Sequence, residues 1–176
     1  DSHIIWAAGA QAQAQTLSSG GVALTLEQAL TEPEKLGKKV LMVDHLGTWA
    51  VVSVAEFLAD IGKQVSLIVP TGIAGWKISI YSSFALKHRL KEKNVQLIPG
   101  HRLLDFANGR ADIEDLSVHD STQALLADSV IAPISGKPNG PPDKDRVILN
   151  IGDSVSARTA LEAVYEGHET ALFLGS

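Results

Sequence analysis

The chain has 176 residues, which is enough for one good-sized core, or for one whole domain with part of another. Hydrophobic residues make up 45% of the sequence and charged residues 20%, so a packed core is expected and a disordered chain is excluded. The net charge is -5 and no basic run is longer than Lys38-Lys39, which argues against a nucleic acid partner.

The sequence contains no cysteine, so it can hold no disulfide, thiolate zinc site or iron–sulfur cluster of its own. That composition is consistent with a cytoplasmic protein. No apolar stretch approaches the ~20 residues that a membrane-spanning helix needs, so no membrane partner is expected. The chain starts at Asp1 without the pattern of a signal peptide and leads directly into a strand-like run. We therefore expect a piece of a larger protein.

The first predicted elements are short. Residues 3–8 are expected to form a buried strand that ends at the small pair Gly9-Ala10, and residues 11–21 a polar loop. Thr25 opens a helical stretch of one or two turns, and Gln28 follows three residues later, which is the pattern of a capping box.

A strand, a helix and a second strand follow within about thirty residues. Residues 40–43 are apolar on both faces, as in a parallel sheet covered on both sides, and residues 49–61 carry apolar side chains at helical spacing before Gly62. Residues 65–69 form the next predicted strand. This is a βαβ unit, for which a right-handed crossover is expected. A second helix is predicted over 79–91 and a third strand over 95–98. The candidates for the buried side of that helix are Ile80, Phe84, Leu86 and Leu90.

The period then changes to short alternating segments. Residues 102–106, 112–118 and 122–126 predict a three-stranded antiparallel meander, with Asn108-Gly109 as its first hairpin turn. Residues 129–132 return to the parallel sheet and 138–143 form a Pro- and Gly-rich linker. The end of the chain predicts a strand over 147–151, a Gly-Asp turn and a helix over 157–174. The side chains expected to face inward from that helix are Leu161, Val164, Tyr165 and Leu172.

This order of elements resembles the second dinucleotide-binding domain of flavoproteins in which one Rossmann-like domain is inserted into another. Residues 1–10 resemble the family's strand that ends Ala-Thr-Gly-Ala, residues 135–139 its Gly-x-x-Pro-Asn return, and residues 151–153 its flavin-proximal Gly-Asp. The expected fold is α/β: a Rossmann-like parallel sheet with an antiparallel three-stranded meander, plus remnant strands and a helix of a second dinucleotide-binding domain. The expected domains are a partial FAD-type domain with its linker over 1–37, an NAD(P)- or ADP-binding-like domain over 38–137, and the second FAD-type remnant over 138–176.

A narrower resemblance lies in the first strand-to-helix turn. Residues 43–49, Val-Asp-His-Leu-Gly-Thr-Trp, followed by 54–59, resemble the C-terminal region of the trimethylamine dehydrogenase and 2,4-dienoyl-CoA reductase family, particularly its amine dehydrogenase and demethylase branch. Arg158-Thr159-Ala160 and Glu166-Gly167-His168 are similar to that branch as well. The resemblance implies a parent enzyme whose catalytic barrel, with FMN and an iron–sulfur cluster, precedes this region. The remainder of that enzyme is then a partner of the chain, and a homo-oligomer is left open.

The same turn is the first candidate site, where a dinucleotide fold presents backbone N–H groups to a pyrophosphate. The candidate residues at the turn and at the end of the next strand are Asp44, His45, Gly47, Thr48, Trp49 and Thr71. The turn has only one glycine, and the charge of Asp44 opposes a phosphate, so a turn that merely connects strand to helix is the alternative. The acid or arginine that usually reads the ribose is missing, although Thr71 and Lys77 could reach it. Trp49 and Trp76 lie beside the turn.

Gly152 and Asp153 are the second candidate site. The resemblance implies that Asp153 contacts the ribityl chain of FAD, whereas the alternative is a capping role at the last helix. FAD would also need a Gly-rich unit that should precede Asp1, so tight FAD binding is not expected. The six histidines lack metal-ligand spacing, and no catalytic residue is predicted.

These observations favour a nucleotide-binding or scaffolding region of a flavin-dependent oxidoreductase, of amine dehydrogenase/demethylase or enoate reductase type. ADP or NAD(P) are the candidate ligands, and the isolated chain is expected to be inactive. A non-catalytic nucleotide-binding or structural module is the alternative, and a free-standing NAD(P)-dependent reductase ranks third. If Gly47 faces a phosphate, Gly47→Val should weaken nucleotide binding by crowding the backbone.

Overall fold

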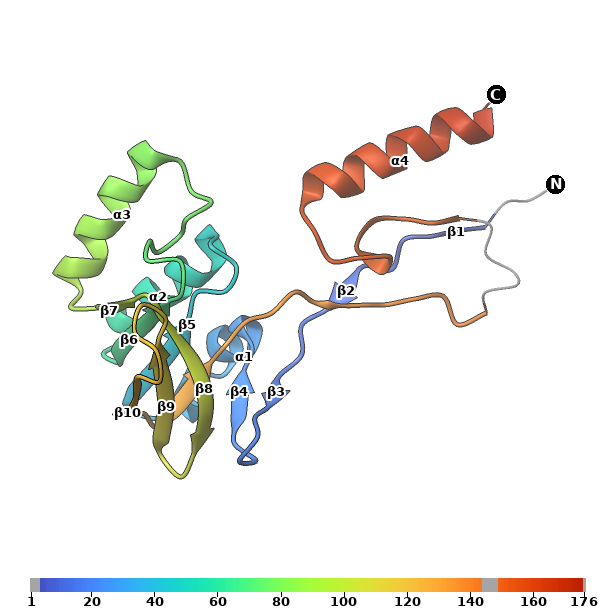
Figure 1. Cartoon of the computed structure of the whole chain (residues 1–176). Coiled ribbons are helices and arrows are strands. Elements are labelled where there is room, and N and C mark those ends of the chain that lie inside the picture. The colour runs from blue at the N-terminus through green and yellow to red at the C-terminus, as the bar shows by residue number, and fades with distance from the viewer. Residues whose placement is uncertain (1–3, 144–148, 176) are drawn as a thin grey trace. The chain divides into compact units, whose positions relative to one another are not determined.

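The computed structural model describes residues 4–143 and 149–175. The chain divides into two compact units, of which unit 1 comprises Asp1–Gln13 with Ser135–Ser176 and unit 2 comprises Ala14–Ile134 (Figure 1).

A six-stranded sheet forms the centre of unit 2. The order of its strands is β3-β4-β11-β5-β6-β7, and all neighbours are parallel except β3 and β4. The strands are β3 (Gln15–Thr16), β4 (Val22–Leu24), β5 (Lys39–Val43), β6 (Gln64–Val69), β7 (Gln96–Pro99) and β11 (Ser129–Ile131). Residues 40–43 of β5 are buried and apolar, as predicted for a strand covered on both faces, and only Lys39 at its start is exposed.

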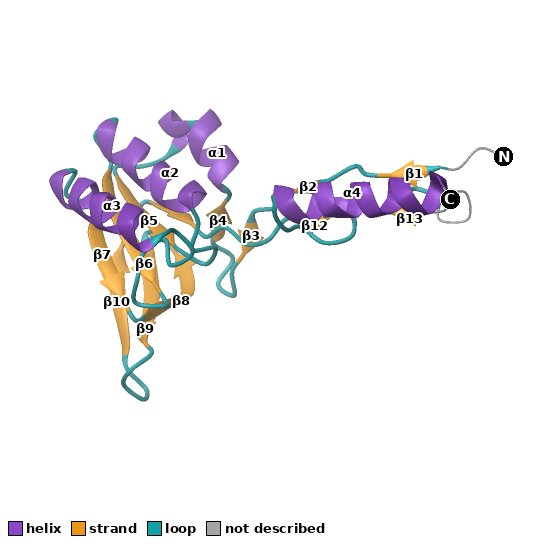
Figure 2. Ribbon diagram, turned by 90° about the horizontal axis from the view of Figure 1, so that it is seen from above, coloured by secondary structure: helices purple, strands orange, loops and turns teal. Residues whose placement is uncertain are grey.

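Helices cover one face of this sheet, as Figure 2 shows for α1 (Leu26–Thr31), α2 (Trp49–Asp60) and α3 (Ile80–Glu92). A short 3-10 helix, η1 (Pro33–Lys35), follows α1. Side chains alternate along a strand, so Val40 and Met42 of β5 pack into the core under the helices, together with Leu58 of α2 and Leu90 of α3.

The antiparallel meander covers the opposite face. It consists of β8 (His101–Ala107), β9 (Arg110–Asp115) and β10 (Thr122–Leu126) in the order β10-β9-β8. Asn108 and Gly109 both have positive φ, at 51° and 77°, which is the hairpin conformation that their sequence predicts. Leu41 and Val43 pack against Ala111 and Ile113 of β9 in this second core. The α/β class and the meander are thereby confirmed.

Unit 1 is built from both ends of the chain. Strand β1 (Ile5–Trp6) pairs in parallel with β13 (Leu149–Asn150), and β2 (Ala10–Gln11) pairs antiparallel with β12 (Lys137–Pro138). A 3-10 helix, η2 (Gly152–Ser154), and helix α4 (Ala160–Gly175) complete it. Val147 and Ile148 of the predicted last strand lie outside the described residues. The side-by-side position of β1 and β13 is what an inserted lobe requires.

The predicted buried face is confirmed at Leu86 and Leu90 of α3 but wrong for the rest of α3 and for α4. Ile80 and Phe84 of α3 are 65% and 69% exposed, because only the second half of the helix, with Leu86 and Leu90, packs on the sheet. Along α4, the apolar side chains stay exposed because the described strands of unit 1 are only two residues long and offer no broad face. The residues concerned are Leu161 (75%), Val164 (71%), Tyr165 (62%) and Leu172 (59%).

Two boundaries also differ from expectation. Residues 11–21, predicted as a loop, contain β3, whose pairing with β4 depends on the backbone and leaves little signal in the side chains. The strand predicted over 112–118 ends at Asp115 instead. Its carboxylate accepts hydrogen bonds from the N–H (2.8 Å) and hydroxyl (2.6 Å) of Ser117, which turns the chain.

The predicted capping box is present at α1. The Thr25 hydroxyl accepts the Gln28 N–H at 3.1 Å, and the Gln28 side-chain oxygen accepts the Thr25 N–H at 2.9 Å. We expect Thr25→Ala to lower the free energy of unfolding by about 1 kcal/mol, because one helix N–H then loses its acceptor. Thr25→Ser keeps the hydroxyl and serves as the control in urea denaturation. Equal losses in the two variants would contradict a capping role.

Candidate functional site

The first candidate site lies at the carboxyl end of β5. Strand β11 pairs with one side of β5 and β6 with the other, so the chain changes direction across the sheet at this point. In open α/β sheets, ligands bind in the crevice at such a switch point. The turn from Asp44 to Thr48 therefore stands where a dinucleotide fold would bind its pyrophosphate.

Asp44 is the centre of this turn. Its side chain is buried, with 1% of its surface exposed. One carboxylate oxygen accepts the N–H of Gly47 at 2.8 Å, and the other accepts the N–H of Gly75 at 2.7 Å. Gly75 belongs to the loop between β6 and α3. The carboxylate thus fastens the turn after β5 to the loop after β6.

Gly47 is enclosed by the same loop. Its φ is +66°, and a Cβ atom built on it would lie 2.3 Å from Nε1 of the Trp76 indole and 2.5 Å from two of its carbons. The carbonyl of Gly47 accepts the N–H of Lys77 at 2.8 Å. The Lys77 ammonium in turn lies 4.8 Å from the centre of the Trp76 ring. Only glycine fits here, because the backbone is left-handed and an indole covers its α-carbon.

The other predicted residues of this site are placed less centrally. Thr48 is the N-cap residue of α2, but its side chain makes no capping hydrogen bond. Trp49 begins α2 and is 45% exposed. The Thr71 hydroxyl donates to the carbonyl of Ile73 at 3.3 Å, within its own loop. His45 is exposed next to Asp44.

Partial loss of hydration lowers the pKa of His45, and the neighbouring charge of Asp44 opposes this shift. The unfolded chain then takes up the proton at higher pH than the folded chain, so stability falls as the pH drops through about 6.5, the ordinary value. We expect the unfolding free energy of the unmodified chain, measured relative to that of His45→Gln, to fall between about pH 8 and about pH 5.5. Urea titrations of both proteins at the two pH values measure it. A difference that does not change with pH would contradict the shift.

Gly152 and Asp153 lie in η2 of unit 1. Gly152 is buried with φ +66°, and its N–H donates to Glu166 of α4 at 2.6 Å. This bond and the ion pair with Arg158 lower the pKa of Glu166. Asp153 accepts the N–H of Arg158 at 3.1 Å. Gly152 therefore joins η2 to α4, and Asp153 joins it to the segment just before that helix.

The structure brings Asp44 and Gly47 into direct contact, whereas Gly152 and Asp153 belong to the other unit. Sequence reasoning missed Gly75 and the backbone of Lys77 as parts of the first site. Their role depends on a loop that folds back thirty residues later in the chain. The available signal is the glycine that precedes Trp76 in that loop.

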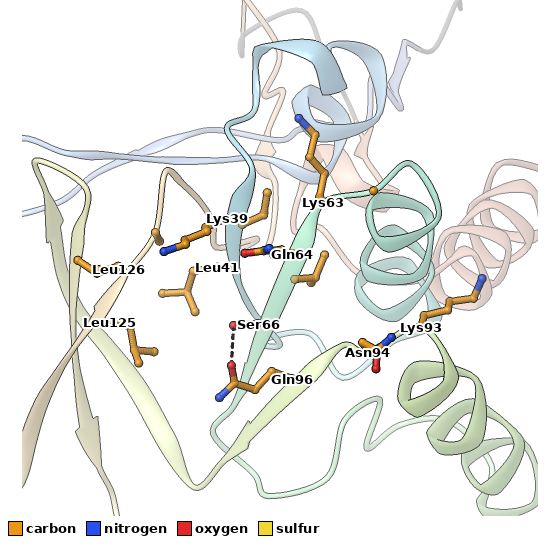
Figure 3. A pocket seen from close by; sticks show the side chains of 14 residues that line it. Lys39, Leu41, Lys63, Gln64, Ser66, Lys93, Asn94, Gln96, Leu125 and Leu126 are labelled. Carbon is orange, nitrogen blue, oxygen red and sulfur yellow. Dashed lines mark hydrogen bonds between the residues drawn. The ribbon is translucent and has the colours of Figure 1, made fainter.

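A separate hollow of about 450 Å³ lies at the opposite, amino end of β5, β6 and β7 (Figure 3). Lys63 donates to the carbonyl of Leu36 and Lys93 pairs with Asp60, so both ammonium groups are engaged outside the hollow. The hydroxyl of Ser66 donates to Gln96 at 3.2 Å across its floor. The position at the amino ends of the strands separates this hollow from the switch point.

Two features are absent from the described residues, 4–143 and 149–175. No group of three or more histidine, aspartate or glutamate side chains there could hold a metal ion. Within the same ranges, no helix has the length and apolar character needed to cross a bilayer.

Together, the two units define a class of fold. A parallel sheet with a meander on one face is inserted into a second unit that both ends of the chain build, which is the fold of FAD- and NAD-binding flavoenzymes. The sequence matches no family model and no curated protein.

Several solved structures share this fold. Histamine dehydrogenase from Rhizobium sp. 4-9 superimposes with a TM-score of 0.81 at 19% identity, over 96% of this chain and 30% of its own. The 6-hydroxypseudooxynicotine amine oxidase from Pseudomonas geniculata N1 gives 0.75 at 18% identity, over 96% and 28%. 2-Naphthoyl-CoA reductase gives 0.74 at 17% identity, over 94% and 26%. All three belong to the trimethylamine dehydrogenase and enoate reductase family, so the resemblance read from the sequence is confirmed at the level of the fold.

Proposed function

We propose that this chain is a scaffolding region of a flavin-dependent oxidoreductase of the amine dehydrogenase or enoate reductase type. In that enzyme the flavin and the cluster would perform the redox chemistry, and this region would support the part that carries them. The chain spans 26–30% of the length of the three structures described above. The substrate therefore depends on residues outside this chain.

The observation that carries the proposal is the parallel pairing of β1 with β13. The register places Ile5 beside Leu149 and Trp6 beside Asn150, so segments more than 140 residues apart form one small sheet. The Trp6 indole also donates to the carbonyl of Asn139 at 2.6 Å. A unit divided in this way supports an inserted lobe, which is the arrangement that the resemblance implies.

The apolar face of α4 supports a scaffolding role. Val164 and Tyr165 each lie about one helical turn after Leu161, and all three side chains are more than 60% exposed. Apolar side chains at helical spacing normally pack against a neighbouring element. We propose that the remainder of the parent enzyme covers this face.

The coding sequence upstream of the codon for Asp1 tests the class of enzyme. We expect an FMN-binding barrel with closely spaced cysteines and a Gly-rich strand–turn–helix unit between that barrel and Asp1. A start codon next to Asp1 would contradict the proposal and favour a free-standing structural module.

The scaffolding role can be tested with Val164→Lys in the full-length enzyme and in this chain alone. We expect little change in the stability of the isolated chain, because Val164 is 71% exposed there. In the full enzyme, burying the added charge should weaken assembly, seen as loss of bound flavin absorbance during gel filtration. Val164→Ala, which adds no charge at the same position, is the matched control. Equal behaviour of the two variants in the full enzyme would rule out this surface.

A further inference from the structure

The fold implies a dinucleotide at the β5–α2 turn, and the residues of this turn do not fit one. A pyrophosphate there needs free backbone N–H groups, close access to a glycine, and no competing negative charge. The contacts of Asp44 and Gly47 meet none of these three conditions.

We propose that the Asp44 carboxylate is the resident anion of this turn, and that residues 72–77 fill the space of a dinucleotide, so that unit 2 binds no NAD(P). Asp44 is nearly fully buried and accepts the N–H groups of Gly47 and Gly75, one on each oxygen. A carboxylate held by backbone N–H groups before the first turn of α2 has the partners that a phosphate would have.

Access to the glycine is closed as well. The N–H of Gly47 is bonded to Asp44 and its carbonyl to Lys77, while the Trp76 indole lies against its α-carbon. Neither the polar groups nor the surface of Gly47 is left for a ligand. The loop that carries Trp76 and Lys77 is held in place by the hydrogen bond from the Gly75 N–H to Asp44.

Charge excludes a second anion. A phosphate brought to Gly47 would lie within a few ångströms of the buried Asp44 carboxylate, where like charges are poorly screened. The end of β6, where a ribose would lie, offers no additional attraction. The strand continues into Pro70 and Thr71, and the Thr71 hydroxyl already donates within its loop.

Nuclear magnetic resonance of the ¹⁵N-labelled chain tests the inference. During titration with NADH, NADPH and ADP, we expect the amide signals of Gly47 and Gly75 and the indole signal of Trp76 to stay in place, with any Kd weaker than about 1 mM. Saturable shifts of these signals at lower concentration would overturn it.

Hydrogen exchange tests the part played by Asp44. In the unmodified chain, the amides of Gly47 and Gly75 should exchange far more slowly than that of the open Gly140. Asp44→Ala should raise both rates at least tenfold, whereas Asp112→Ala, at a surface ion pair, should change neither. If Asp44→Ala does not fold, the rates in the unmodified chain decide alone, and exchange as fast as that of Gly140 refutes the bonds. The inference goes beyond the proposed function. A dinucleotide bound at this turn would overturn the inference but would leave the test by the upstream coding sequence unaffected.

Discussion

Replacing Asp44 with alanine is expected to lower the free energy of unfolding of unit 2 by about 2 to 5 kcal/mol. The substitution leaves two backbone N–H groups, those of Gly47 and Gly75, without their acceptor. Each buried unsatisfied donor costs about 1 to 3 kcal/mol. Movement of the loop around Gly75 toward water keeps the sum below the upper limit. Urea denaturation followed by tryptophan fluorescence measures the loss, since Trp49 and Trp76 flank the site.

Asp112→Ala is the matched control for this substitution. Asp112 pairs with Arg110 at 2.9 Å, with 63% of the arginine side chain and 38% of the aspartate side chain exposed. A surface pair of this kind contributes at most about 1 kcal/mol. If both alanine variants lose the same small amount, the Asp44 carboxylate does not hold the two loops together, and the closed turn is disproved with it.

The elements of unit 2 could be predicted because local chemistry and tertiary packing agree. The apolar run at β5, the Thr25–Gln28 cap and the Asn108-Gly109 turn each specify an element from a few neighbouring residues. Unit 1 behaves differently. Apolar runs predicted strands over residues 3–8 and 147–151, which include β1 and β13, whereas β2 and β12 are two residues long and carry no such signal. The expectation that the two chain ends meet came from the resemblance.

The predictions that were wrong concern features that neighbouring residues do not specify. Apolar spacing along α4 predicted a buried face, but spacing cannot show whether the covering surface belongs to the same chain. At the candidate site, sequence reasoning correctly noted that the charge of Asp44 opposes a phosphate. It could not show that the charge has partners of its own, because Gly75 lies 31 residues away and reaches Asp44 only through the fold.

Gly47→Ala tests two reasons for a glycine at this turn, its positive φ and the contact of its α-carbon with the Trp76 indole. The sequence left two roles open for Gly47, a glycine that admits a phosphate or part of a simple connecting turn, and the structure shows it under the indole of Trp76. We expect Gly47→Ala to lower the unfolding free energy by about 2 to 4 kcal/mol, of which ~1 to 2 is backbone strain at positive φ and the rest is displacement of the indole. Gly72→Ala is the control, because Gly72 also has positive φ, +82°, but no atom within 4 Å of an added Cβ.

A double-mutant cycle in urea denaturation tests the contact between Gly47 and Trp76. In a Trp76→Ala background, Gly47→Ala should cost no more than Gly72→Ala, because only the backbone strain remains. Once the Trp76 ring is removed, the methyl group added at position 47, like the one at position 72, no longer meets an indole. A full loss at Gly47 without Trp76 would mean that another contact requires the glycine. The pairing of this residue with the loop after β6 would then no longer explain the closed turn.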